Sequence, residues 1–179
     1  YTRCRSKISP APFIDLLVEL PSPYAHDMAP DVRTSGPPRA LFVCVHNAGR
    51  SQMAAAFLNV LSEGRAFGES AGTEPGEHVH PEVAEVMREV DIEVGDAVPR
   101  LLTMEMLDGA DRVVTMGCFV EDACPTAIVD TEDWGLPDPK EQPLAEVRRI
   151  RDQIQDRVAL LLREMGVAPS AKGHTTSGA

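Results

Sequence analysis

Positive charge is scarce in this sequence. Lysine and arginine together number 17 against 28 aspartates and glutamates in 179 residues, which gives a formal net charge of −11 at pH 7. A general nucleic-acid binder needs a basic face, so we expect no nucleic-acid partner. No apolar run approaches the roughly 20 residues that a membrane-spanning helix needs, so we expect no membrane partner either. The 43% hydrophobic and 25% charged residues are typical of a soluble globular protein.

Cysteine is also rare. Four cysteines in a chain of this length do not make a disulfide scaffold, and we see no signal peptide. We therefore expect a reducing, cytoplasmic location, where a disulfide is more often catalytic than structural. The four are Cys4, Cys44, Cys118 and Cys124.

Proline divides the chain into unequal parts. Residues 1–38 hold seven of its 15 prolines, and we interpret them as a mostly irregular extension. Residues 39–168 are predicted to form the compact domain. Residues 169–179 are small and polar, and they are predicted to be a disordered tail.

Apolar segments of strand character alternate with segments of helical periodicity in the compact domain. This alternation predicts an α/β fold, with a four-stranded parallel sheet flanked by helices on both faces. Ligands of such sheets bind outside the carboxyl ends of the strands, so the loops that follow the strands should converge there. The predicted strands are 40–43, 65–71, 111–116 and 126–129, and the predicted helices are 51–61, 81–90, 103–107 and 143–165.

The segment from Cys44 to Ser51, Cys-Val-His-Asn-Ala-Gly-Arg-Ser, is predicted to be a tight loop between the first strand and the first helix. Backbone N–H groups and a helix dipole would meet there, which favours the binding of an oxyanion. A helix start and a nearby cation also favour the thiolate of Cys44. Arg50 can hold two oxygens of a tetrahedral anion. We therefore predict nucleophilic attack by Cys44 on an oxyanion held by Val45, His46, Asn47, Ala48, Gly49, Arg50 and Ser51.

Four residues of this loop have more specific interpretations. The Ser51 hydroxyl can bond the cysteine sulfur and stands where a helix cap is expected. Asn47 tolerates a left-handed backbone and can brace the loop, and Gly49 would let the backbone approach the anion. His46 either tunes the charge of the site or merely fills a loop position.

Asp138 lies between two prolines, in Leu136-Pro137-Asp138-Pro139. The prolines would hold its carboxyl group in a stiff loop, where it can protonate an oxygen that leaves a cysteine-bound oxyanion. An ordinary turn is the alternative interpretation when the segment is taken alone.

Cys118 and Cys124 lie six positions apart in one predicted loop. They can relay oxidation from Cys44, because a thiolate attacks an oxidised sulfur; inert cysteines are the alternative. The spacing is wider than that of usual zinc pairs, so we expect no metal site. His78 and His80 are interpreted as surface histidines of a loop.

These motifs resemble those of the low-molecular-weight protein tyrosine phosphatase superfamily, and most closely those of its arsenate reductase branch. The resemblance extends over about residues 39–167, essentially the whole compact domain. It is carried by Val43-Cys44 through Gln52-Met53-Ala54, Ser70-Ala71-Gly72-Thr73, Trp134 with Leu136-Pro137-Asp138-Pro139, and the paired cysteines.

The resemblance implies a reaction and a set of partners. Cys44 would attack arsenate while Arg50 and the loop amides hold its oxygens, and Asp138 would help water leave; phosphate or sulfate would compete. A second thiol would then release arsenite. The resemblance implies no bound cofactor but an external thiol reductant: thioredoxin, with Cys118 and Cys124 as the relay, or mycothiol or glutathione with a glutaredoxin-like protein.

Two other functions remain open from the sequence. The same loop binds phosphate, so a phosphatase acting on phosphotyrosine or on a small phosphoester is the first alternative. Phosphatases of this superfamily usually carry aromatic residues after the Asp-Pro pair, whereas Lys140-Glu141-Gln142 follows here. The second alternative is a sensor of oxidants or oxyanions that uses Cys44 as a switch.

Overall fold

The computed structural model describes residues 36–117 and 131–170. Helices and strands alternate through most of these ranges, as the sequence predicts. In chain order the elements are β1 (Arg39–Cys44), α1 (Arg50–Ser62), β2 (Phe67–Gly72), α2 (Pro81–Arg88), α3 (Met104–Asp108), β3 (Arg112–Thr115), β4 (Glu132–Asp133) and α4 (Leu144–Glu164).

The four strands form one sheet in the order β2-β1-β3-β4, and every neighbouring pair is parallel. This confirms the predicted four-stranded parallel sheet. The register aligns the carboxyl ends of the three longer strands, because Val43 of β1 pairs with Ala71 of β2 and with Thr115 of β3. The loops that follow these strands therefore leave the sheet at one edge.

The fourth strand differs in place from the prediction. Glu132 and Asp133, which belong to none of the predicted strands, form β4 beside β3. Both side chains are exposed, so this short edge strand lacks the buried apolar residues by which a strand is recognised in a sequence. The predicted strand at 126–129 lies outside the described residues.

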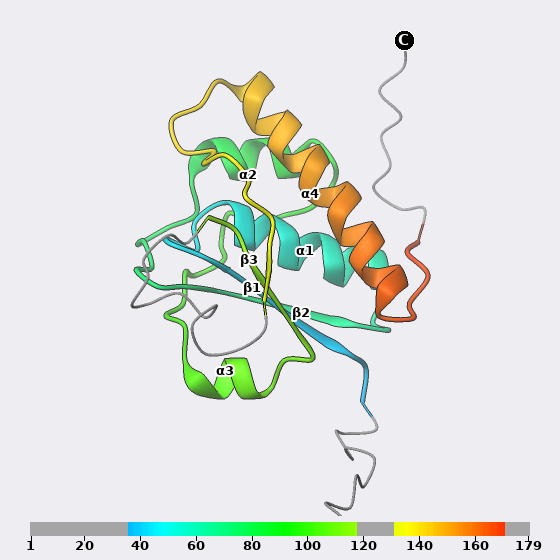
Figure 1. Cartoon of the computed structure of the whole chain (residues 1–179). Coiled ribbons are helices and arrows are strands. Elements are labelled where there is room, and N and C mark those ends of the chain that lie inside the picture. Colours follow the sequence, from blue (N-terminus) through cyan, green and yellow to red (C-terminus); the bar gives the residue numbers. More distant parts are fainter. Residues whose placement is uncertain (1–35, 118–130, 171–179) are drawn as a thin grey trace, which may run out of the picture. The chain divides into compact units, whose positions relative to one another are not determined.

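Helices cover the sheet on both faces, as Figure 1 shows: α1, α2 and α4 lie on one side and α3 on the other. Strand β1 is buried on both faces. Phe42 belongs to the larger core with the three helices, whereas Leu41 and Val43 belong to the smaller core beneath α3. This double burial explains why β1 reads as a continuous apolar run rather than an alternating one.

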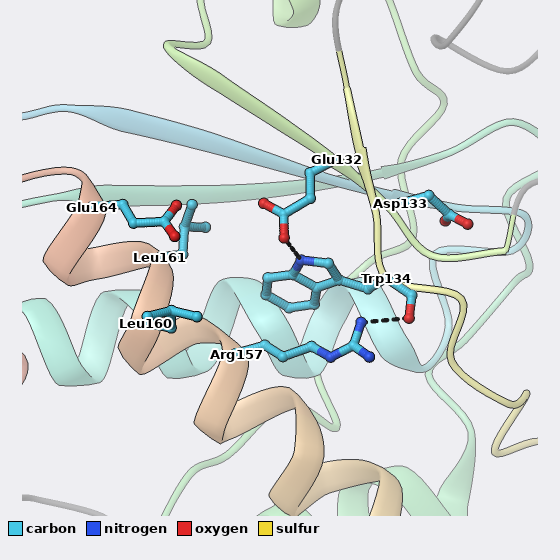
Figure 2. A pocket seen from close by; sticks show the side chains of 7 residues that line it. All are labelled: Glu132, Asp133, Trp134, Arg157, Leu160, Leu161 and Glu164. Carbon is cyan, nitrogen blue, oxygen red and sulfur yellow. Dashed lines mark hydrogen bonds between the residues drawn. The ribbon is translucent and has the colours of Figure 1, made fainter.

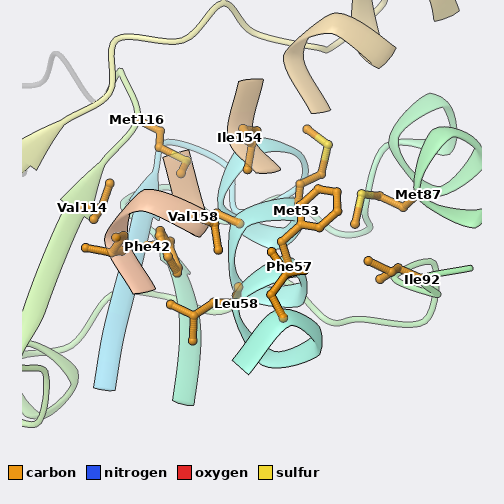
Figure 3. Close-up of a cluster of buried hydrophobic side chains, with 14 of the residues drawn as sticks. Phe42, Met53, Phe57, Leu58, Met87, Ile92, Val114, Met116, Ile154 and Val158 are labelled. Atoms are coloured by element: carbon orange, nitrogen blue, oxygen red, sulfur yellow. The ribbon is translucent and has the colours of Figure 1, made fainter. Parts of the chain in front are cut away.

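The larger core fills the space between the sheet, α1, α2 and α4 (Figure 3). Phe57 of α1, Met87 of α2 and Ile154 of α4 are completely buried there. Helix α1 is thus packed between the sheet and the other helices, which fixes the position of its amino-terminal turn.

Helix α4 is fastened to α2 by arginines as well as by apolar contacts. Arg151 is buried and donates to the carbonyl oxygen of Val86 at 2.8 Å and to Glu89 at 3.1 Å. Arg148 donates from two nitrogens to the same carboxylate. The hydrogen bond from Arg148, with the charges of both arginines, lowers the pKa of Glu89 below its ordinary value.

Two neighbouring leucines of α4 test how much this packing stabilises the fold. Leu162 is completely buried, whereas Leu160 is 54% exposed. We expect Leu162→Ala to lower the free energy of unfolding by about 2–5 kcal/mol, because it leaves a cavity in the core. The matched variant Leu160→Ala should cost less than about 1 kcal/mol. Urea denaturation of both variants measures this, and equal losses would contradict the packing described.

Candidate active site

The loop between β1 and α1 places a thiol and a guanidinium at one pocket. Cys44 is the last residue of β1 and is 3% exposed; Arg50 is the first residue of α1, and its side chain is 8% exposed. Both line one small pocket. Pockets for drug-sized ligands measure about 300–1,000 Å³, and this one is far smaller.

The sulfur of Cys44 is hydrogen-bonded within its own loop. The backbone N–H of Asn47 donates to the sulfur at 3.2 Å, and the Ser51 hydroxyl oxygen lies 3.0 Å from the sulfur, where either atom can be the donor. A backbone N–H donor favours a sulfur anion. The predicted bond between Ser51 and the sulfur is thus present. The predicted cap is not, because the helix begins at Arg50 with Gly49 at the N-cap position.

Asn47 is the centre of a buried hydrogen-bond network. It has a left-handed backbone, with φ 49°, and its amide group donates to Ser51 at 2.9 Å. Its side-chain oxygen accepts from Gln52 at 3.2 Å and from the backbone N–H of Arg100 at 2.8 Å. The side chain therefore joins the start of α1 to a segment 53 residues further along the chain.

The backbone amides of the loop remain available to a ligand. Those of Val45, His46, Ala48 and Gly49 make no hydrogen bond to another residue of the described ranges, whereas the carbonyl groups of Val45, His46 and Ala48 are paired. Their partners are the backbone N–H groups of Glu74, Gly76 and His80. The carbonyl groups thus hold the loop in place, and the backbone N–H groups are left to bind an anion.

Two glycines permit close packing around the loop. A Cβ on Gly72 would lie 2.6 Å from the carbonyl oxygen of Val45 and 2.9 Å from the nitrogen of Asn47, so the end of β2 presses directly on the loop. A Cβ on Gly49 would lie 2.8 Å from Cγ of Pro139. Pro139 therefore packs where a side chain of residue 49 would begin. This packing requires glycine at position 49, and the sequence alone did not reveal it.

Arg50 connects the loop of residues 44–51, here called the anion loop, to the loop of residues 134–140, here called the aspartate loop. Its Nη1 donates to the carbonyl oxygen of Leu136 at 2.8 Å, and its Nη2 donates to Asp138 Oδ2 at 3.0 Å. The other oxygen of Asp138 accepts from the backbone N–H of Lys140 at 3.0 Å. Asp138 lines the same pocket as Cys44, so the two loops that carry these residues converge as predicted.

Trp134 anchors the start of the aspartate loop. Its ring is buried and lies 5.7 Å from the ring of Phe42, and its indole N–H donates to Glu132. Arg157 of α4 donates to the carbonyl oxygen of Trp134 and places its guanidinium 5.8 Å from the ring centroid. Figure 2 shows the contacts of Trp134 with Glu132 and Arg157 at a second pocket, between β4 and α4. The start of the aspartate loop is thus held in place.

His80 is a pocket residue that the sequence analysis assigned to the surface. It lies just before α2, lines the pocket with Cys44 and Arg50, and is half-buried. His46 lines the pocket too, and its Nδ1 is 3.0 Å from the carbonyl oxygen of Glu74. His78 is exposed, as expected. The sequence held no periodic or spacing signal that separates His80 from His78.

Cys118 and Cys124 lie outside the described residues, so their predicted relay stays a prediction. The described chain reaches Gly117, whose backbone N–H donates to Asp133 at 3.3 Å beside the aspartate loop. Residues 36–117 and 131–170 contain no cluster of three potential metal ligands and no helix long and apolar enough to cross a membrane.

A four-stranded parallel sheet, with a cysteine and an arginine at one pocket beyond the carboxyl end of β1, is the arrangement of a low-molecular-weight phosphatase fold. Residues 39–168 match the family model described as low molecular weight phosphotyrosine protein phosphatase, and the chain belongs to this family.

Within the family, the chain is similar to proteins named as arsenate reductases. It is 43% identical to a putative arsenate reductase of Halobacterium salinarum over 128 residues, which cover 69% of this chain and 89% of that protein. It resembles the structure of a thioredoxin-dependent arsenate reductase of Corynebacterium glutamicum with a TM-score of 0.62 and 34% identity. That match covers 74% of this chain and 64% of the other chain, so this chain spans somewhat less than two thirds of that relative.

A phosphatase is similar as well. The structure of an arginine phosphatase from Geobacillus stearothermophilus has a TM-score of 0.64 and 26% identity, and the match covers 73% of this chain and 94% of that one. The fold thus occurs both in proteins named as arsenate reductases and in a protein named as a phosphatase.

Gly72 supplies a test of how the loop is supported. We expect Gly72→Ala to lower the free energy of unfolding by about 1–3 kcal/mol, because its methyl group would collide with backbone atoms of the loop. The same variant should weaken phosphate binding, measured by calorimetry. In the control Gly76→Ala, the added Cβ would be 3.7 Å or more from its neighbours, so both quantities should stay near wild type. Unchanged phosphate affinity in Gly72→Ala would contradict the packing argument.

Proposed function

We propose that this protein reduces arsenate to arsenite. The observation that carries the proposal is the convergence of the Cys44 sulfur, Arg50 and Asp138 on one small pocket. The similarity to proteins named as arsenate reductases supports the choice of oxyanion. The polar segment Lys140-Glu141-Gln142 supports it further, because it offers no aromatic side chain to grip a phosphotyrosine ring.

The first step is nucleophilic attack on arsenic. The Cys44 thiolate, stabilised by the Asn47 N–H and the Ser51 hydroxyl, forms a sulfur–arsenic bond. Arg50 and the unpaired amides of the loop bind the remaining oxygens, as preorganised donors do for a developing oxyanion. One arsenic–oxygen bond breaks, and Asp138 supplies the proton with which that oxygen leaves as water.

The second step reduces the arsenic. A second thiolate attacks the Cys44 sulfur and forms a disulfide, and the electron pair of the sulfur–arsenic bond passes to arsenic. Arsenic(V) becomes arsenic(III) and departs as arsenite, while two thiols are oxidised. The bound oxyanion and these thiols suffice for the reaction, and the proposal includes no resident cofactor or metal.

Cys118 is our proposed second thiol, and Cys124 is the proposed cysteine that passes the disulfide outward. Thioredoxin is then the reductant, and the description of the Corynebacterium relative as thioredoxin-dependent supports this route. The alternative is attack by mycothiol or glutathione, with recycling by a glutaredoxin-like protein. Both routes require a reducing compartment, and we propose the cytoplasm.

Phosphatase activity is the second candidate function. The family assignment and the similarity to an arginine phosphatase favour it, because a pocket that binds arsenate also binds phosphate. The phosphatase reaction consumes water and no thiol, so thiol dependence separates the two functions.

The proposal predicts arsenite release that requires both thiol and Cys44. Wild-type protein should release arsenite from arsenate over many turnovers only with a thiol system, and faster than it hydrolyses p-nitrophenyl phosphate without thiol. Cys44→Ser should abolish arsenite release, and Asp138→Asn should slow it by about 10²–10⁴-fold through loss of the proton donor. The matched control Cys4→Ser should retain wild-type turnover. Phosphate release alone would overturn the reductase assignment in favour of the phosphatase.

A further prediction separates the recycling routes. With thioredoxin and thioredoxin reductase as the electron source, Cys118→Ser and Cys124→Ser should each stop multiple turnover, because each breaks the relay. Turnover is measured as NADPH oxidation that depends on arsenate. Full thioredoxin-driven turnover in both variants would refute the intramolecular relay, and the mycothiol and glutathione systems would then be assayed on the same preparation.

A further inference from the structure

His80 brings a titratable group to the anion pocket from outside the anion loop. The residue lies between β2 and α2, and its backbone N–H donates to the carbonyl oxygen of Ala48 at 2.9 Å. That bond holds it beside the loop. Its ring lies close to Gly49, since Cδ2 would be 3.6 Å from a Cβ at that position. The half-buried ring lines the pocket with Cys44, Arg50 and Asp138.

The ring of His80 has no structural partner among residues 36–117 and 131–170. It does not cap α2, because no side-chain hydrogen bond is made at that position. The other histidine of the pocket differs, since Nδ1 of His46 bonds the carbonyl oxygen of Glu74. A half-buried polar ring that lines the pocket of Cys44 and Arg50, with no described protein partner, is available to a ligand.

The charges around His80 come from several elements. The anion loop and α1 contribute His46, the thiol of Cys44 and the guanidinium of Arg50, and the aspartate loop contributes Asp138, which is paired with Arg50. The Glu82 carboxylate in the first turn of α2 accepts from the backbone N–H of Glu141. Arg50 thus shares its charge with Asp138, so an additional cation would strengthen anion binding.

We infer that His80 is a second anion-binding residue of this pocket and makes oxyanion affinity depend on pH. Histidine is the side chain that most readily gains a positive charge as the pH falls through the physiological range. The protonated ring attracts a doubly charged oxyanion and can donate a hydrogen bond to it. The residue therefore favours dianions over monoanions and neutral ligands, increasingly so as the pH falls. The inference rests on the anion pocket of the proposed function.

Sulfate is the appropriate probe, because it remains a dianion throughout this pH range and needs no redox partner. Its dissociation constant is measured by isothermal titration calorimetry at about pH 8 and about pH 5.5, for wild type and for His80→Gln. His80→Gln leaves Cys44, His46 and Asp138 unchanged in sequence, so the comparison with wild type reports the loss of the imidazole. His78→Gln is the matched control, since His78 is exposed and does not line the pocket.

We expect wild type and His80→Gln to bind sulfate equally at about pH 8. At about pH 5.5 wild type should bind about five- to tenfold more tightly than His80→Gln, because one charge acts on a dianion a few ångströms away. His78→Gln should follow wild type, and His80→Lys should keep the tighter binding at both pH values. Circular dichroism verifies that the variants are folded.

Equal affinities of wild type and His80→Gln at both pH values would overturn the inference. A constant ratio at both pH values would also overturn it, because the effect would then not follow protonation. Either result leaves the arsenate assay unaffected, and a protein that binds sulfate as predicted but releases no arsenite would refute the reductase instead.

Discussion

The arrangement of the site depends on the two hydrogen bonds of the Arg50 guanidinium. One nitrogen is bound by the Leu136 carbonyl oxygen and another by the Asp138 carboxylate, residues that lie 86 and 88 positions away in the sequence. A buried cation needs such partners, because removing it from water is otherwise costly. The same two bonds therefore give the guanidinium its hydrogen-bond partners and hold Asp138, the proposed proton donor, at the pocket. They also hold the aspartate loop against the anion loop at the carboxyl edge of the sheet.

The surrounding structure keeps these groups in place. On one side Asn47 links the anion loop to Ser51, Gln52 and the segment at Arg100. On the other side Trp134, packed against Phe42 and bound by Arg157, fixes the aspartate loop. The support at Asn47 is a network of satisfied hydrogen bonds, and the support at Trp134 is a buried ring with close partners. A satisfied buried network favours one arrangement of its side chains, because any other would leave a buried polar group without a partner.

Much of the fold and the heart of the candidate site follow from local sequence patterns. The apolar run of β1, the helical periodicity of α4 and the C-x5-R spacing each belong to a single segment, so they predict the sheet, the helix and the loop directly. The convergence of the loops that carry Arg50 and Asp138 follows one step later, since parallel strands end at one edge of their sheet.

Other features of the fold and the site depend on contacts between segments that are far apart in the sequence. No local sequence pattern predicts them. Gly49 is needed because Pro139 packs on it, and Gly72 because the anion loop crosses it. His80 resembles His78 in the sequence, yet only His80 is among the pocket residues. The short β4 has exposed side chains and could be recognised only from its pairing with β3. Such residues are defined by distant neighbours rather than by periodicity.

The central claim is that the Cys44 sulfur and Arg50 face the same bound oxyanion. The most direct test is the rate of Cys44 alkylation by iodoacetamide, followed by peptide mass spectrometry with and without saturating arsenate under conditions free of added thiol. The account predicts that arsenate slows alkylation of Cys44 in the wild-type protein and gives no protection in Arg50→Ala. Equal alkylation rates with and without arsenate in the wild-type protein would contradict it.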